Sequence, residues 1–142
     1  MASESTPSVV ELKLPCKPEF VGVARLTVLG IAGRMSFSYD EVEDVRLAVG
    51  EACTTAVERA VKANKTDTDI SIIGSILGNK LTIEVRDQAG HPIDAADKPQ
   101  TTEVEELDEQ GLGALLMELL VDEFNVESYE DGTIVRMVKY AE

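Results

Sequence analysis

The chain has no tryptophan, and three phenylalanines and three tyrosines are its only aromatic residues. The chain therefore has few aromatic side chains on which bases could stack, as they do in many nucleic-acid-binding proteins. Basic residues are also scarce, because 13 Lys and Arg stand against 27 Asp and Glu, and the formal net charge is −14. Phosphate backbones and anionic lipids recruit Lys and Arg. We therefore expect no direct nucleic-acid or membrane partner, and a basic protein segment suits this surface better.

Metal-binding sulfur and imidazole groups are scarce too, with two cysteines and one histidine in the whole chain. Cys16 and Cys53 lack the paired spacing of a structural zinc site. We expect both to be reduced, semi-buried residues that behave as small apolar side chains. His91 follows Gly90 and precedes Pro92 in a polar stretch, which favours a surface imidazole over a catalytic one.

Long apolar runs are absent, and none approaches the ~18 residues of a membrane span. The N-terminus also lacks the charged stub and apolar run of a signal peptide, so we expect a cytoplasmic protein. With 142 residues and 44% apolar content, the chain can form one domain with a single core. Residues 1–8 are small and polar and are interpreted as a disordered tail, which leaves residues 9–142 as the domain.

Apolar periodicity predicts a strand and two helices in the first half of the chain. Residues 9–15 alternate with period two until Pro15, which is typical of an edge strand. Residues 19–35 repeat apolar positions at helical spacing, and a second helix should begin at Ser38 or Asp40, either of which can cap it. Six apolar residues then form one stripe over about six turns: Val42, Val45, Val49, Ala52, Ala56 and Ala60.

Two β-hairpins are predicted in the second half. Residues 69–77 and 80–87 are rich in β-formers and flank Gly78-Asn79, a strong turn signal. Residues 125–140 form the second hairpin, with its turn at Asp131-Gly132.

Between the hairpins, residues 88–110 show no sustained period, and a connection of this length is usually functional or mobile. Residues 111–124 form a short apolar helix that opens with Gly111 and Gly113. This order of elements predicts an α+β two-layer sandwich, with a mixed β-sheet and helices on one face.

Glu51 and Thr55 stand one turn apart on the long helix, about 40° from each other. The carboxylate could accept a proton from a hydroxyl or water, and the threonine oxygen could touch a phosphate or a metal-bound water. From spacing alone, two ordinary residues on a solvated flank are the favoured interpretation.

Two further candidate sites are Asp87, which ends a strand before Gly90, and the glycines that open the last helix. Asp87 could accept a hydrogen bond from an exocyclic amine, and the alternative is a solvated turn. Gly111 and Gly113 could leave backbone N–H groups facing an anion, and the alternative is a flexible helix start. The acidic residues 102–109 match no calcium loop and are interpreted as a solvated or mobile face.

These motifs occur in a fixed order: EAxxT on a helix, DxAG at a strand end, a long loop, then GLG at a helix start. The order resembles the GHKL ATP-binding fold, and within it the anti-sigma-factor serine kinases of the RsbW and SpoIIAB type, most of all RsbW. The similarity extends from LPCKPEFVGVARLTV through EDVRLAVGEACTTAV to GLGALLMELLVDEF and GTIVRMVKY.

The resemblance implies a protein-serine kinase that uses ATP and Mg²⁺. It implies phosphorylation of an STAS-domain anti-anti-sigma protein, and otherwise sequestration of a sigma factor. A homodimer is implied as well, and Arg25 matches a first-helix arginine that contacts protein partners.

Site residues follow from the same resemblance. Glu51 matches the general base for the serine hydroxyl, and Asp87 matches the residue that reads the adenine amine. Residues 94–110 match the ATP lid. The nucleotide would also be contacted by Thr55, Gly90, Gly111, Leu112 and Gly113.

Two positions depart from the family pattern. Thr55 stands where the family has an asparagine that holds magnesium, and a threonine hydroxyl is a shorter ligand for a metal that demands good geometry. Ala89 stands where a glycine is expected, although Gly90 follows it. A catalytically weakened or silent protein-binding regulator of the same fold is therefore the alternative to an active kinase, and an unrelated small regulator is a third hypothesis.

Overall fold

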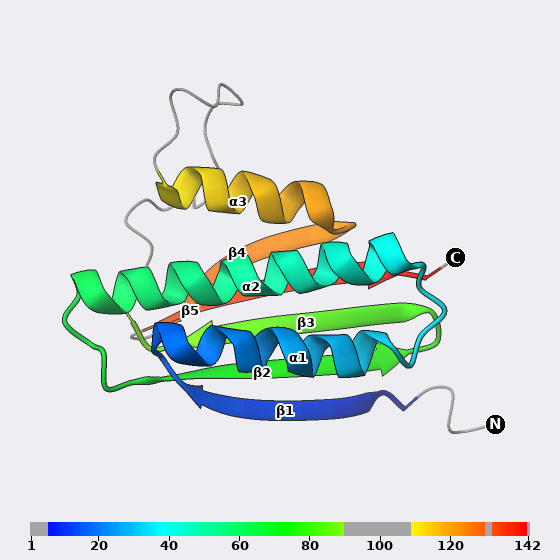
Figure 1. Cartoon of the computed structure of the whole chain (residues 1–142), viewed down its shortest axis with the longest axis horizontal. Helices are drawn as coiled ribbons and strands as arrows, with labels where there is room; N and C mark the ends of the chain where they lie inside the picture. Colours follow the sequence, from blue (N-terminus) through cyan, green and yellow to red (C-terminus); the bar gives the residue numbers. More distant parts are fainter. Residues whose placement is uncertain (1–5, 90–108, 130–131, 142) are drawn as a thin grey trace.

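The computed structural model describes residues 6–89, 109–129 and 132–141 (Figure 1). The described residues form five strands and three α-helices, and a short 3₁₀ helix (Pro18–Phe20) precedes the first α-helix. The elements in chain order are β1 (Ser8–Pro15), α1 (Val21–Ala32), α2 (Tyr39–Lys62), β2 (Asp69–Leu77), β3 (Lys80–Asp87), α3 (Glu109–Leu120), β4 (Glu123–Tyr129) and β5 (Gly132–Tyr140).

The five strands form one sheet in the order β1-β2-β3-β5-β4. All three helices lie over one face of it (Figure 1). The predicted α+β two-layer sandwich is confirmed, but the mixed pairing is wrong, because every pairing among the described strands is antiparallel. The reason lies between β1 and β2, where the chain passes through two helices. The second helix returns the chain to the end of the sheet where β1 finished, whereas a single crossover helix would give parallel strands.

Strand β1 forms an edge of the sheet, as the sequence predicts, with Pro15 at its end. Ser8, the last residue of the expected tail, already pairs with Ile76 on β2. The hairpin between β2 and β3 is confirmed, and Gly78 in its turn has a φ of 61°, the left-handed region that glycine adopts without strain. The second predicted turn lies partly outside the described residues, since β5 begins at Gly132.

Helix α2 begins with a capping box, and Ser38 is the N-cap. The backbone N–H of Glu41 donates to Ser38 Oγ at 3.1 Å, and the Ser38 N–H donates to Glu41 Oε1 at 2.8 Å. Such a cap stabilises a helix by about 0.5–2 kcal/mol. The apolar stripe of α2 is buried except for Val42, which is half-buried, and the helix packs between α1 and α3 above β3. This central place explains why α2 supplies most of the site described below.

Both cysteines are free thiols, as expected, but Cys16 and Cys53 are each 1% exposed and therefore fully buried, where the sequence predicted partial burial. Burial raises the pKa of Cys16 to about 11 and that of Cys53 to about 12. Both thiols therefore stay protonated at neutral pH and are poor nucleophiles.

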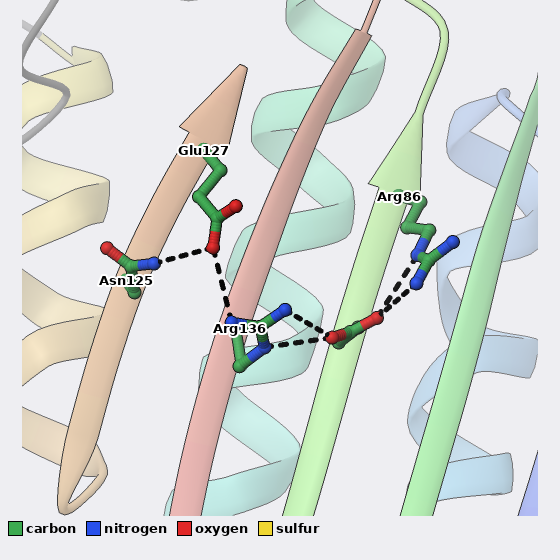
Figure 2. Close-up of polar contacts among 5 residues, drawn as sticks. Arg86, Asn125, Glu127 and Arg136 are labelled. Carbon is green, nitrogen blue, oxygen red and sulfur yellow. Dashed lines mark hydrogen bonds and ion pairs between the residues drawn. The ribbon is translucent and has the colours of Figure 1, made fainter. Parts of the chain in front are cut away.

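The sheet face opposite the helices carries a charged network across β4, β5 and β3 (Figure 2). Glu84 accepts hydrogen bonds from Arg86 and from Arg136, and Arg136 also lies 3.2 Å from Glu127. Asn125 donates to Glu127 at 2.9 Å. Because this face of the sheet is polar, apolar and polar side chains alternate along the strands, and the apolar ones point toward the helices. No helix in the described part of the chain is long and apolar enough to span a membrane.

Candidate functional site

A hollow of about 300 Å³ lies between α2 and α3, which run side by side above the sheet (Figure 1). Three of the predicted site residues line this hollow, namely Glu51, Leu112 and Gly113. The remaining lining residues are Thr54, Glu58 and Leu116. The structure therefore brings the EAxxT and GLG motifs together, although about 60 residues separate them in the sequence.

Gly113 is the point where α3 comes closest to the Glu51 side chain. A Cβ at this position would lie 2.6 Å from Glu51 Oε2 and 3.2 Å from Thr55 Cγ2. The first distance is far below an ordinary van der Waals contact. Only glycine allows the two helices to approach with Glu51 in this orientation.

Helix α3 begins at Glu109, two residues before the predicted start at Gly111. In α-helical geometry the N–H of Gly113 is directed at the carbonyl four residues earlier. The structure therefore supports a role of Gly113 in close packing rather than as an N–H donor. Gly111 is half-buried in the first turn, and Leu112 is exposed at the rim of the hollow.

Glu51 is half-buried, and its pKa is raised above the ordinary value. Burial is the main cause, the negative charge of Glu58 adds to it, and the positive charge of Arg25 opposes it. A carboxylate with a raised pKa is a stronger proton acceptor, and general bases gain efficiency as their pKa approaches the working pH.

Arg25 extends from α1 across α2 at Gly50, next to Glu51. Its Nη2 and Cζ lie 3.1 Å and 3.2 Å from the place of a Cβ at Gly50, and its Nε lies closer still. The Nε is buried and has no hydrogen-bond partner. The residue expected to contact partners thus lies beside the expected base.

Asp87 is 1% exposed, so the solvated-turn alternative is wrong for it. Its Oδ2 forms an ion pair with Arg59 at 2.6 Å, and its Oδ1 accepts a hydrogen bond from the Ala89 N–H at 2.9 Å. Its carbonyl accepts one from the Tyr129 hydroxyl at 2.8 Å. Ala89 does not adopt the positive φ for which a glycine would be needed, because in the described chain Asn64 is the one non-glycine residue that does so.

The family model of the histidine kinase-like ATPase domain matches residues 14–139. The serine-protein kinase RsbW of Bacillus licheniformis is 44% identical over 92% of this chain and 84% of the relative. RsbW of Bacillus subtilis is 41% identical over the same shares of the two chains. The chain belongs to the RsbW family of serine-protein kinases.

A solved structure supports the fold of this RsbW-family chain. The crystal structure of the RsbU and RsbW domains of Rv1364c from Mycobacterium tuberculosis matches with a TM-score of 0.69 at 15% identity. The match covers 94% of this chain and 32% of that chain. At this identity the likeness shows the fold alone, and the family itself, an ATPase domain, makes ATP the ligand to test in the hollow.

Thr55, the position that departs from the RsbW-type motif, is 3% exposed, so the solvated-flank alternative is wrong for it. Its hydroxyl donates to the Ala52 carbonyl at 3.0 Å, and its methyl group is directed at Gly113, 3.2 Å from the place of a Cβ there. Among the residues that the structure describes, no group of three or more His, Cys, Asp or Glu side chains could hold a metal ion. Magnesium needs several oxygen ligands in a near-octahedral arrangement. The Thr55 hydroxyl in this orientation does not fit such an arrangement.

Some expected site residues of this RsbW-family chain lie outside the described residues. These are Gly90 and residues 94–108 of the expected ATP lid, and His91, for which a surface position was expected, lies outside them too.

Besides the lining residues Thr54 and Leu116, two charged residues, Glu58 and Arg59, were not predicted from the sequence. Glu58 stands seven residues after Glu51, a spacing that returns to the same helix face. Arg59 interrupts the buried run of alanines at Ala56 and Ala60, and a charged residue in an apolar stripe is itself a signal of a buried partner. The partner, Asp87, could not be found from spacing, because it lies on another element.

Proposed function

We propose that the protein is an ATP-dependent serine kinase that phosphorylates an STAS-domain anti-anti-sigma protein and otherwise sequesters a sigma factor. The observation that carries this proposal is the half-buried Glu51, with its raised pKa, packed against Gly113 at the hollow between α2 and α3. The curated relatives are serine-protein kinases by name.

In the proposed reaction Glu51 takes the proton of the target serine hydroxyl. The serine oxygen then attacks the γ-phosphorus of ATP, the bond to the β-phosphate oxygen breaks, and ADP leaves. Enzymes of this kind work mainly by positioning and charge stabilisation. The packing of Gly113 against Glu51 supplies such positioning for the base.

ATP would lie with its adenine amine at Asp87 and its phosphates toward α3, where Gly111, Leu112 and Gly113 lie. Magnesium enters the proposal as the counter-ion that ATP carries, and none of the described residues is assigned as its ligand. We also propose that Arg25 contacts the protein partners and that the protein acts as a homodimer. A sigma-factor partner would place the protein in the cytoplasm.

The test is transfer of γ-phosphate to the STAS-domain partner by Glu51→Gln. Loss of a general base lowers the rate by about 10²–10⁴-fold, while ATP affinity should stay within a few-fold of wild type. Glu43→Gln is the matched control, because Glu43 lies on the same helix and pairs with Arg46 outside the hollow. Transfer that survives in Glu51→Gln would remove Glu51 from the role of base.

A silent protein-binding regulator of the same fold is the second candidate. The observation that favours it is Thr55, whose hydroxyl is committed to Ala52 and whose methyl group faces α3. It predicts nucleotide binding that does not depend on magnesium, with sigma-factor binding intact. Magnesium-dependent turnover by the wild type would defeat it.

A further inference from the structure

The ion pair between Arg59 and Asp87 joins the C-terminal half of α2 to the end of β3. The two side chains are 7% and 1% exposed, and they are the buried charged residues of the described chain. Arg59 Nη2 lies 2.6 Å from Asp87 Oδ2, while the Ala89 N–H holds Oδ1 at 2.9 Å. Each of the two carboxylate oxygens of Asp87 is therefore held by one hydrogen-bond donor.

The pair determines what Asp87 can offer a ligand. An ionised carboxylate only accepts hydrogen bonds and has about four lone-pair positions. Arg59 and the Ala89 N–H use two of them, so about two remain for a ligand. The planar guanidinium orients the carboxylate through a short charge-assisted hydrogen bond.

We propose that Arg59 is a positioning residue for base selection, which holds Asp87 as an oriented acceptor for the 6-amino group of a purine. The inference rests on the proposed function, in which Asp87 lies at the adenine. A purine with a 6-oxo group would bring an acceptor against an acceptor, and a site built for a donor rejects such a ligand strongly. Arg59 acts through Asp87 and needs no contact with the nucleotide.

A merely structural ion pair would have a different signature. Breaking such a pair would lower the thermal stability of the protein and would weaken the binding of all nucleotides alike. A positioning role changes the contribution of one ligand group, the 6-amine. Comparing ATP with purine riboside triphosphate, which differs by lacking that amine, isolates this contribution.

The experiment measures the dissociation constants of both nucleotides by calorimetry for wild type, Arg59→Gln and Arg59→Lys. Wild type should prefer ATP by about 10–100-fold, the range for a hydrogen bond to a charged group. The preference should fall to within about threefold of unity in Arg59→Gln. It should be intermediate in Arg59→Lys, which keeps the charge without the planar fork. Arg86→Gln is the control, since Arg86 is adjacent to Asp87 but pairs with Glu84 on the opposite face (Figure 2).

Each outcome of this experiment supports or overturns the positioning role of Arg59. Folded Arg59 variants that keep the wild-type preference would overturn the positioning role while leaving the kinase proposal intact. If Arg59→Gln fails to fold, the preference of Arg59→Lys alone decides. A wild type that binds ATP and purine riboside triphosphate equally would remove Asp87 from the amine, and Arg59 with it. A wild type that binds neither nucleotide would overturn the proposed function itself.

Discussion

Two charges of opposite sign act on Glu51 from its surroundings, and both are set by single residues. Glu58 is seven residues along α2 and raises the pKa of Glu51, while Arg25 reaches from α1 and lowers it. Arg25 can lie there because Gly50 has no side chain to exclude the guanidinium. Arg25, which is expected to contact protein partners, is thus also part of the electrostatic environment of Glu51.

The role of Arg25 can be measured in the acid limb of the pH profile. In the proposed mechanism the active form requires ionised Glu51, so kcat/KM should rise as the pH passes the pKa of that group. Arg25→Gln removes a charge that favours the carboxylate, so the acid limb should move to higher pH.

Two further variants sharpen the Arg25 test. Gly50→Ala should move the acid limb in the same direction, because the added methyl group displaces the guanidinium. Arg25→Lys should keep most of the wild-type profile, since the charge remains. A lower rate with an unmoved acid limb in Arg25→Gln would assign Arg25 to partner contact alone.

Thr55 can be tested as a packing residue by separating its methyl group from its hydroxyl. The structure places the methyl group against α3 and commits the hydroxyl to Ala52. Thr55→Val keeps the shape, so the stability and the effect of magnesium on ATP affinity should match wild type. Thr55→Ser removes the methyl group and should cost about 1 kcal/mol of unfolding free energy.

The opposite pattern would make the hydroxyl of Thr55 a metal ligand. In that case Thr55→Val would lose the magnesium-dependent part of ATP affinity and Thr55→Ser would keep it. Thr55→Asn supplies the family residue at this position, so a gain in magnesium-coupled affinity would identify Thr55 as the departure that matters. Chelation of divalent cations during calorimetry gives the magnesium-free reference for all variants.

At the scale of elements, the spacing between α2 and α3 depends on Gly113. A methyl group there would meet Glu51 Oε2 at 2.6 Å, and the end of this flexible side chain can move aside. Gly113→Ala should therefore fold, because alanine also favours the helix by about 0.5–1 kcal/mol. Phosphate transfer should fall by about tenfold or more, because misplacing a reacting group by about 1 Å can cost ~10²-fold.

Gly30→Ala is the matched control for the α2–α3 contact. Gly30 lies in α1, and a Cβ there has no neighbour within 4 Å. It should leave transfer unchanged and raise the unfolding free energy by up to about 1 kcal/mol. Wild-type transfer in Gly113→Ala would show that the close approach of the two helices does not hold the base.

Elements specified by local signals were predicted well from the sequence. The turn at Gly78 was predicted, and of the two caps that the sequence allowed for α2, Ser38 and Asp40, the structure has Ser38, in a capping box with Glu41. The antiparallel pairing was not, because it depends on how two helices return the chain to β2. The earlier start of α3 at Glu109 also escaped, since the glycines mark close packing rather than the helix end.

The candidate site shows the same division. Glu51, Asp87 and Gly113 came from the order of motifs that resembles the family, while periodicity alone left each of them ambiguous. Arg59 escaped because its partner is 28 residues away on β3, and the contact exists only once α2 lies over the sheet. The burial of Thr55 escaped because it depends on α3, which lies against this face of α2 only in the folded protein.

At the scale of the whole molecule, the formal net charge of −14 should govern how partners arrive. Opposite charges speed the encounter of two proteins over distances that salt shortens to about 10 Å at 0.1 M. Association with a basic segment of the proposed sigma-factor partner should therefore slow by about tenfold or more between 0.05 and 0.5 M salt.

Dissociation should change much less over this range of salt, because short-range contacts rather than long-range attraction determine the lifetime of the complex. Stopped-flow measurements at several salt concentrations separate the two rate constants. An association rate independent of salt would mean that the acidic surface does not guide the partner. In that case the net charge would serve solubility, and recognition would depend on local contacts such as those expected of Arg25.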